Sequence, residues 1–163
     1  MSSDLMFTIS VWALPLLLAI TLHEAAHGFV AWKLGDDTAL RMGRVTFNPF
    51  RHIDLFGTII MPALMLLASG GRMMFGFAKP VPVDFSRLRR PRRDMVLVAL
   101  AGPGTNIGLA VVCALLFHIL PLLPEEFAVW VAYNLKNAIW INTLLAVFNM
   151  LPIPPLDGGR VAV

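Results

Sequence analysis

Four long segments without a charged side chain dominate the hydropathy pattern of this chain. They are Leu5–Leu22, Leu55–Gly71, Met95–Pro124 and Asn137–Leu156. Apolar segments of about 18 residues or more are long enough to cross the hydrocarbon core of a bilayer as helices. The pattern therefore predicts a mainly α-helical, polytopic membrane protein, with helices over about 5–34, 95–120 and 127–149.

The segment Leu55–Gly71 differs from the other three because it is short and carries residues that interrupt helices. Gly57 and Pro62 lie inside it, and Gly70-Gly71 end it. Both residue types weaken a helix interior. We therefore expect three spanning helices plus one short re-entrant or half-inserted segment.

Two stretches between the apolar segments favour extended backbone. From Arg41 to Phe47 apolar and polar residues alternate, and Asn48-Pro49 follows, which is typical of short strands. Lys79–Val83 contains two prolines, each of which disfavours helix at the residue before it. A small β-strand element at the cytoplasmic side is therefore expected beside the helices.

Composition agrees with a single membrane-embedded domain over residues 1–163. Hydrophobic residues make up 58% of the chain and charged residues only 14%, and the mean hydropathy is +0.75, which excludes an ordinary soluble globule. The net charge of +3 does not indicate a nucleic-acid partner, because the basic residues lie between apolar segments. The single cysteine excludes a disulfide framework and a cysteine-based zinc site.

The positions of the basic residues predict the orientation in the membrane. Eleven of the thirteen lysines and arginines fall between Lys33 and Arg93. Because basic loops stay on the cytoplasmic side, this region is expected in the cytoplasm and the N-terminus outside. The predicted location is the plasma or inner membrane, in which the chain crosses several times.

A candidate metal site lies inside the first apolar helix, in His23-Glu24-Ala25-Ala26-His27. Residues i and i+4 share one helix face, so the two histidines can offer imidazole nitrogens to one metal ion. Glu24 is rotated about 100° round the helix axis, where it can act as a base on a water molecule. A polar cluster without metal is disfavoured, because ionisable residues within membrane segments usually mark functional sites.

A zinc site needs a third protein ligand, and the sequence leaves several candidates. His52 and His118 remain open, although a lone histidine in an apolar segment is more often a hydrogen-bonded core residue. The best candidate is Asp157, which follows a proline-rich stretch. Non-helical backbone at membrane depth is tolerated only where it is buried or lines a watery cavity, so a carboxylate there needs a partner.

The combination of motifs resembles the site-2 protease family of intramembrane zinc metalloproteases. The HEAAH sequence is paired with a distant Asn149…Pro152…Asp157-Gly158-Gly159, and Ala101-Gly102-Pro103 with Asn106 is similar to a third family signature. The resemblance implies one Zn²⁺ per chain. Its ligands would be His23, His27 and Asp157, its catalytic base would be Glu24, and Asn149 and Asn106 would bind substrate.

Two further expectations follow from the resemblance. The stretch Gly76–Val83 is similar to the bacterial and archaeal branch without a PDZ domain, and the chain is expected to be truncated at Val163. Topology supplies an independent expectation, because the site closes only if one apolar segment fails to cross the membrane. That segment would be Leu55–Gly71, and the active site would then lie toward the cytoplasmic side.

The predicted function is hydrolysis of a peptide bond in or near the transmembrane segment of a membrane protein. The partners are then a transmembrane protein substrate and the lipid bilayer, without nucleic acid, and the oligomeric state stays open. The stretches Arg41–Phe47 and Lys79–Val83 are candidates for hydrogen bonds to an extended substrate. The alternative is a non-enzymatic zinc-binding membrane protein, a transporter or sensor, but several intramembrane acids and internal repeats are absent from the sequence.

Overall fold

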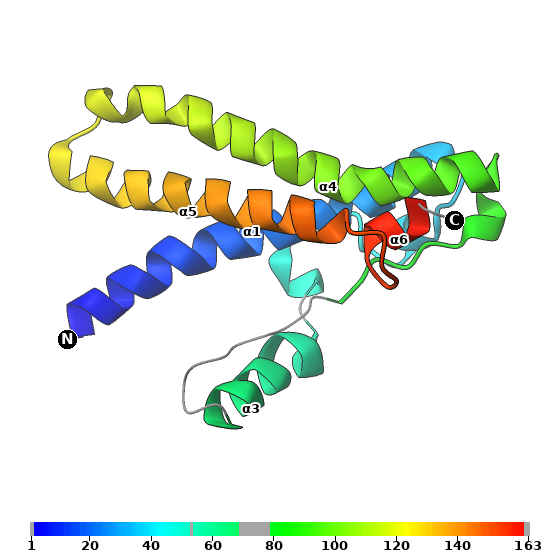
Figure 1. Cartoon of the computed structure of the whole chain (residues 1–163), viewed down its shortest axis with the longest axis horizontal. Helices are drawn as coiled ribbons and strands as arrows, with labels where there is room; N and C mark the ends of the chain where they lie inside the picture. Colours follow the sequence, from blue (N-terminus) through cyan, green and yellow to red (C-terminus); the bar gives the residue numbers. More distant parts are fainter. Residues whose placement is uncertain (1, 53, 69–78, 162–163) are drawn as a thin grey trace.

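Three long helices form the body of the molecule (Figure 1). The computed structural model describes residues 2–52, 54–68 and 79–161. Within these ranges the long helices are α1 (Ser2–Leu34), α4 (Pro91–Leu116) and α5 (Glu125–Asn149). The prediction of a mainly α-helical protein is confirmed.

Shorter helical elements connect and flank these three helices. They are α2 (Thr38–Arg41), η1 (Pro49–Arg51), the π-helix η2 (Leu55–Ile60), α3 (Met61–Ala68), η3 (Phe85–Arg87), η4 (Phe117–Leu122) and α6 (Asp157–Val161). Lys79–Val83 belongs to no helix, as its prolines predict.

The predicted strand pair at Arg41–Phe47 is wrong, since no strand occurs across the described ranges. Buried Asp36 accepts hydrogen bonds from the N–H and hydroxyl of Thr38, which begins a helical turn instead. That turn ends where Gly43 adopts φ +64° and the Arg44 N–H bonds to the Ala39 carbonyl at 2.9 Å. A strand also needs a neighbouring strand to pair with, and the described ranges contain none.

Helices α1 and α5 run in the same direction, and α4 runs opposite to both (Figure 1). Trp130 Nε1 on α5 donates to Ser10 Oγ on α1 at 3.0 Å, and Asn137 Nδ2 donates to the Val11 carbonyl at 2.8 Å. As a result, the C-terminal ends of α1 and α5 meet at one end of the molecule. This is the arrangement that brings residues after α5 to the HEAAH motif.

The helix surfaces fit an apolar environment. Among the described residues, two segments are long and apolar enough to cross a membrane, Asp4–Leu34 and Pro91–Leu122. Within the most apolar 18 residues of each segment, only 22% and 6% are buried. The core helix of a soluble protein would be mostly buried. Helix α5 does not meet the same criterion, because Lys136 and several asparagines interrupt its apolar character.

The segment after Asp54 is helical but short. The π-helix η2 continues directly into α3. At 1.5 Å per residue, residues 55–68 together extend only about 21 Å. A bilayer core is about 30 Å thick, so this segment is too short to cross it. In Figure 1, α3 lies apart from the three long helices. The end of the predicted segment, at 69–71, lies outside the described residues.

Candidate metal centre

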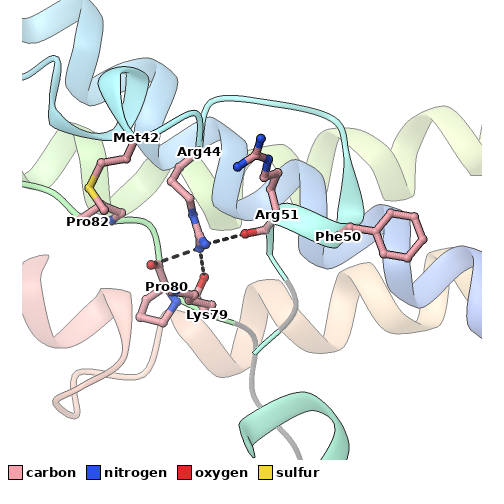
Figure 2. Close-up of a pocket in the computed structure, with 7 residues that line it drawn as sticks. All are labelled: Met42, Arg44, Phe50, Arg51, Lys79, Pro80 and Pro82. Carbon is pink, nitrogen blue, oxygen red and sulfur yellow. Dashed lines mark hydrogen bonds between the residues drawn. The ribbon is translucent and has the colours of Figure 1, made fainter. Parts of the chain in front are cut away.

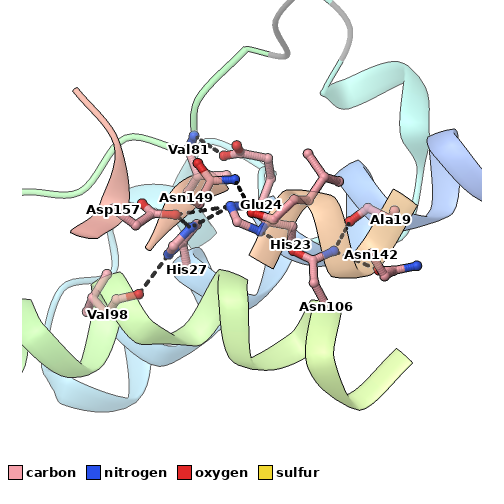
Figure 3. Close-up of polar contacts among 11 residues, drawn as sticks. Ala19, His23, Glu24, His27, Val81, Val98, Asn106, Asn142, Asn149 and Asp157 are labelled. Atoms are coloured by element: carbon pink, nitrogen blue, oxygen red, sulfur yellow. Dashed lines mark hydrogen bonds and ion pairs between the residues drawn. The ribbon is translucent and has the colours of Figure 1, made fainter. Parts of the chain in front are cut away.

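Two histidines from α1 and one aspartate from α6 converge on a single point (Figure 3). The Nε2 atoms of His23 and His27 are 3.1 Å apart, and each lies 3.2 Å from Asp157 Oδ2. All three side chains are buried, with exposed fractions of 6–8%. The structure thus brings together the three residues that the sequence nominates as metal ligands.

Local sequence explains how each ligand reaches this point. His23 and His27 are one helical turn apart on α1, so their rings leave the same face of the helix. Asp157 is the first residue of α6, and a loop of residues 150–156 turns the chain back after α5. A Cβ on Gly158 would lie 2.3 Å from the Met150 carbonyl oxygen, so this tight return requires glycine.

The hydrogen bonds of the two imidazoles fix which nitrogen carries the proton. His27 Nδ1 lies 2.7 Å from the Val98 carbonyl oxygen, which can only accept, so Nδ1 is the donor. His23 Nδ1 faces Asn106 Oδ1 at 2.5 Å, and the Asn106 amide nitrogen donates to Asn142 Oδ1 at 2.7 Å. Asn106 Oδ1 is therefore an acceptor, and His23 Nδ1 also donates.

Both Nε2 atoms consequently present lone pairs toward each other and toward a carboxylate oxygen. Three electron-rich atoms within 3.2 Å repel one another unless a cation or proton lies among them. Two neutral imidazoles and one carboxylate, each imidazole held by an outer hydrogen bond, form a typical ligand set for a catalytic zinc ion. The residues present therefore fit a metal ion.

Gly102 on α4 forms the wall of this site. A Cβ built there would lie 2.4 Å from His27 Nε2 and 2.6 Å from His23 Nε2. Any side chain at 102 would thus occupy the space that the ligand nitrogens face. The sequence draws attention to Ala101-Gly102-Pro103 as a motif, but its geometric reason is visible only in the folded chain.

Glu24 is not one of the three residues whose atoms converge on the candidate metal site. Its Oε2 accepts a hydrogen bond from the Val81 N–H at 2.8 Å, and its side chain is half-buried beside the histidine pair (Figure 3). A carboxylate next to a metal site but outside the ligand set can serve as a proton acceptor. The Val81 N–H belongs to Lys79–Val83, a candidate for hydrogen bonds to substrate, and here it binds Glu24 instead.

The remaining sequence-nominated residues fall into different places. Asn106 is fully buried and contacts His23, so it supports a ligand. Asn149 donates to the Leu145 carbonyl within α5 at 3.0 Å. His52 contacts the Thr46 carbonyl, and His118 is exposed near the opposite end of α4, so neither histidine joins the ligand cluster. Asn142, which anchors Asn106, is a residue that the sequence analysis missed.

An apolar groove of about 670 Å³ lies along the same stretch of α1 as the ligands. Its lining from α1 includes Leu22, Ala25 and Ala26, which interleave with the HEAAH histidines. The rest of the lining is Phe29, Trp32, Val45, Thr46, Phe47 and Thr105. None of His23, His27 and Asp157 is among its lining residues.

Comparison with known proteins gives a consistent picture. A model of peptidase family M50 matches residues 124–163. YwhC of Bacillus subtilis, named "Putative zinc metalloprotease", is 41% identical over 152 residues, which cover 91% of this chain and 65% of YwhC. Rip2 of Mycobacterium tuberculosis carries the same description and is 32% identical over 142 residues, covering 87% of this chain and 52% of Rip2.

A third relative with this description comes from Methanocaldococcus jannaschii and is 47% identical over 66 residues, or 39% of this chain and 31% of its own length. The chain spans between about half and two thirds of the length of YwhC and Rip2. No solved structure matches it. Zinc is the metal specified in the names of all three relatives.

Proposed function

We propose, from the match to the peptidase family M50 model and the similarity to YwhC and Rip2, that this chain is an intramembrane zinc metalloprotease of the site-2 protease family. It hydrolyses a peptide bond in or near the transmembrane segment of a membrane protein. One Zn²⁺ binds per chain, held by His23, His27 and Asp157. Glu24 is the catalytic base.

The observation that carries this proposal is the convergence of three lone-pair-bearing atoms beside a carboxylate that is not a ligand. A structural zinc site is closed by four protein ligands, whereas a catalytic site keeps one position open. Three ligands are present in the described part of the chain, and Glu24 lies next to them. This set supports hydrolysis better than metal storage.

The reaction divides between the metal and Glu24. Zinc, when bound, lowers the pKa of a coordinated water and polarises the scissile carbonyl. Glu24 takes the proton of the attacking water on its carboxylate and gives it to the leaving amine. Asn106 and the Val98 carbonyl keep both histidines in the tautomer that leaves Nε2 free to ligate.

The substrate site proposed here is the apolar groove along α1. Its lining is almost wholly apolar, which suits the side chains of a transmembrane segment unwound for cleavage. Ala25 and Ala26 are small, so a bound apolar segment can lie close against α1 in the groove. Asn149, the last residue of α5, is proposed to contact the bound substrate.

The membrane arrangement completes the proposal. Helices α1, α4 and α5 cross a plasma or inner membrane, and the segment Leu55–Ala68 is half-inserted. The metal-binding end of the bundle faces the cytoplasm, next to the basic residues between Lys33 and Arg93. Opposite directions of α4 and of the pair α1 and α5 support three crossings.

Replacing Glu24 by glutamine tests the function directly. Glutamine keeps the shape of the side chain but cannot accept the water proton. We expect Glu24→Gln to retain zinc and to lose cleavage of a model transmembrane peptide by at least about 100-fold. Glu125→Gln, a matched change at the exposed start of α5, should leave both unchanged. Equal cleavage by wild type and Glu24→Gln would remove the protease assignment.

A further inference from the structure

An extended segment, Lys79–Val83, crosses close to the HEAAH helix and touches Glu24. We call this segment the strap. The Val81 N–H donates to Glu24 Oε2 at 2.8 Å, and the Val81 side chain is 7% exposed. A Cβ on Gly28 of α1 would lie 3.1 Å from Val81 Cγ1, so the strap packs tightly on this helix.

The sequence of the strap restricts which of its groups can contact Glu24. Pro80 and Pro82 have no N–H, so Val81 carries the single backbone donor between them. The Lys79 N–H is used elsewhere, on the His52 carbonyl at 3.0 Å. The two proline rings also restrict the backbone on either side of Val81. One donor is therefore presented in a stiff segment.

Arg44 binds the strap through main-chain carbonyls (Figure 2). Its guanidinium donates to the main-chain carbonyls of Arg51, Lys79 and Pro80, with Nη2 lying 2.5 Å from the Lys79 oxygen and 3.4 Å from the Pro80 oxygen. The side chain is only 6% exposed. A buried arginine is costly unless its N–H groups find acceptors. Two of the three acceptors of Arg44 are carbonyls of the strap, so the buried guanidinium depends on the strap being in place.

The position of one peptide unit links these two contacts. The Pro80 carbonyl and the Val81 N–H belong to the same planar trans peptide, in which the two bonds point in opposite directions. Holding the oxygen on the Arg44 side therefore aims the hydrogen at Glu24 on the other side. Hydrogen bonds in such a chain also polarise and strengthen one another.

From this geometry we infer that Arg44 is a positioning residue for Glu24, acting through the peptide unit between Pro80 and Val81. The inference rests on the proposed function, in which Glu24 is the base. Val81 holds Oε2, so Oε1 is the oxygen that takes the proton from water. Without Arg44, the peptide unit and the carboxylate are free to turn, although zinc and the substrate groove remain.

The kinetic test compares three arginine variants in detergent, with a model transmembrane peptide as substrate. Arg44→Met should lower kcat by about 10- to 100-fold, as expected for a misplaced catalytic group. KM and zinc content should stay within about twofold, because neither the groove nor the ligands are changed. Arg44→Lys keeps donors for the carbonyls and should recover part of kcat.

Arg51→Met is the matched control, because Arg51 and Arg44 line the same pocket (Figure 2). The Arg51 side chain is exposed, and its contact with Arg44 is through its main-chain carbonyl, which the substitution preserves. Its kcat should equal that of wild type. A kcat loss for Arg51→Met similar to that for Arg44→Met would assign the effect to general loss of charge and overturn the inference.

A second measurement follows the Val81 amide itself. In protein labelled with ¹⁵N-valine, the Val81 amide proton should shift upfield in both Glu24→Gln and Arg44→Met, and should not move in Arg51→Met. A double-mutant cycle adds a Val81 backbone ester, which removes the N–H. If Arg44 acts through this N–H, Arg44→Met should lower kcat little further in the ester protein. Full additivity would overturn the inference.

The outcomes separate this inference from the proposed function. If wild type cleaves and Glu24→Gln does not, but Arg44→Met keeps the wild-type kcat, the inference alone fails. If wild type does not cleave, the proposed function fails. The amide shift then still decides the structural link: a shift in Arg44→Met supports it, and an unchanged shift overturns it.

Discussion

Gly102 is the residue at which a minimal change should have the largest effect on metal binding. Gly102→Ala adds one methyl group that would lie 2.4 Å from His27 Nε2 and 2.5 Å from His23 Cε1. Because both rings are buried and held by outer hydrogen bonds, they cannot move away at low cost. We expect zinc affinity to fall by at least about 100-fold, as measured by competition with a chelator.

Gly104 and Gly108 provide controls on the same helix. A Cβ at either position meets nothing within 4 Å. Gly104→Ala and Gly108→Ala should therefore bind zinc like wild type. Equal affinity in all three alanine variants would show that Gly102 does not border a metal site.

Asn106 makes a second prediction at this scale. Its Oδ1 accepts from His23 Nδ1, while its amide is anchored by Asn142. Asn106→Ala removes the group that orients the His23 ring, and such outer contacts are worth about 10- to 100-fold in metal affinity. We expect that loss by chelator competition. Asn134→Ala, which changes a buried asparagine that donates to the Trp130 carbonyl within α5, should not change zinc affinity.

The sequence analysis identifies ligands more readily than their surroundings. The i, i+4 spacing of the histidines is local, so it follows from helix geometry alone. Asp157 lies 130 residues further along, and its assignment depends on the resemblance as well as on the prolines before it. Gly102 matters because it has no side chain to fill the space beside the histidines, and Arg44 contacts main-chain carbonyls. The spacing of residues along the sequence reveals neither effect.

At the scale of elements, the strand prediction failed where local hydrogen bonds compete with alternation. Asp36 accepts from Thr38 and from the Asp84 N–H at 2.7 Å, so it joins the end of α1 to α2 and to the chain before η3. The alternation of apolar and polar side chains at Arg41–Phe47 does not reveal that a buried carboxylate organises the chain beside it. By contrast, three of the four long apolar segments overlap the three long helices, and the fourth is the short segment that begins at Leu55.

The Asp36 junction yields a prediction about stability. Burial raises the pKa of the Asp36 carboxyl, but hydrogen bonds from Thr38 and Asp84, together with the Arg87 charge, outweigh it and hold the pKa below its ordinary value of 3.8. Its stabilising contribution is therefore present above pH 3.8 and is lost as the pH falls through the lower folded pKa. Asp36→Asn should abolish that part of the acid dependence.

Measurement of unfolding free energy in mixed micelles checks this prediction. Asp36 is fully buried, and hydrogen bonds to a charged group contribute about 1.5–3 kcal/mol, so Asp36→Asn should lose an amount in that range at pH 7. Asp37→Asn is the neighbouring control. Asp37 pairs with exposed Arg41 and Arg87, and such pairs contribute at most about 1 kcal/mol. Equal losses for both variants would contradict the junction's special role.

For the whole molecule, the direction of the helices matters more than their number. The contact of Ser10 with Trp130 at one end, and the link from His23 through Asn106 to Asn142 further along, set α1 and α5 in the same direction. The contact between His27 and Val98 sets α4 against α1, since Val98 lies near the start of α4. In the proposed topology, a segment at 55–68 that stays on one side of the membrane makes these directions compatible with three crossings.

This arrangement fixes which loops share a side of the membrane, and thiol labelling can test it. In a Cys113→Ala background, single cysteines replace Asp4, Leu122 or Arg92, each of which is exposed. Because α1 and α4 are antiparallel, the start of α1 and the turn after α4 should lie on one side, and Arg92 on the other. The basic residues near Arg92 predict that this side is cytoplasmic.

We therefore expect a membrane-impermeant maleimide to label Asp4→Cys and Leu122→Cys on intact cells. Arg92→Cys should react only after the cells are permeabilised, and labelling of all three after permeabilisation is the control for reactivity. Labelling of Leu122→Cys and Arg92→Cys from the same side would mean that α4 does not cross. In that case the metal centre, which needs α4 alongside α1, would lie outside the bilayer, and cleavage of transmembrane segments would require another route to the site.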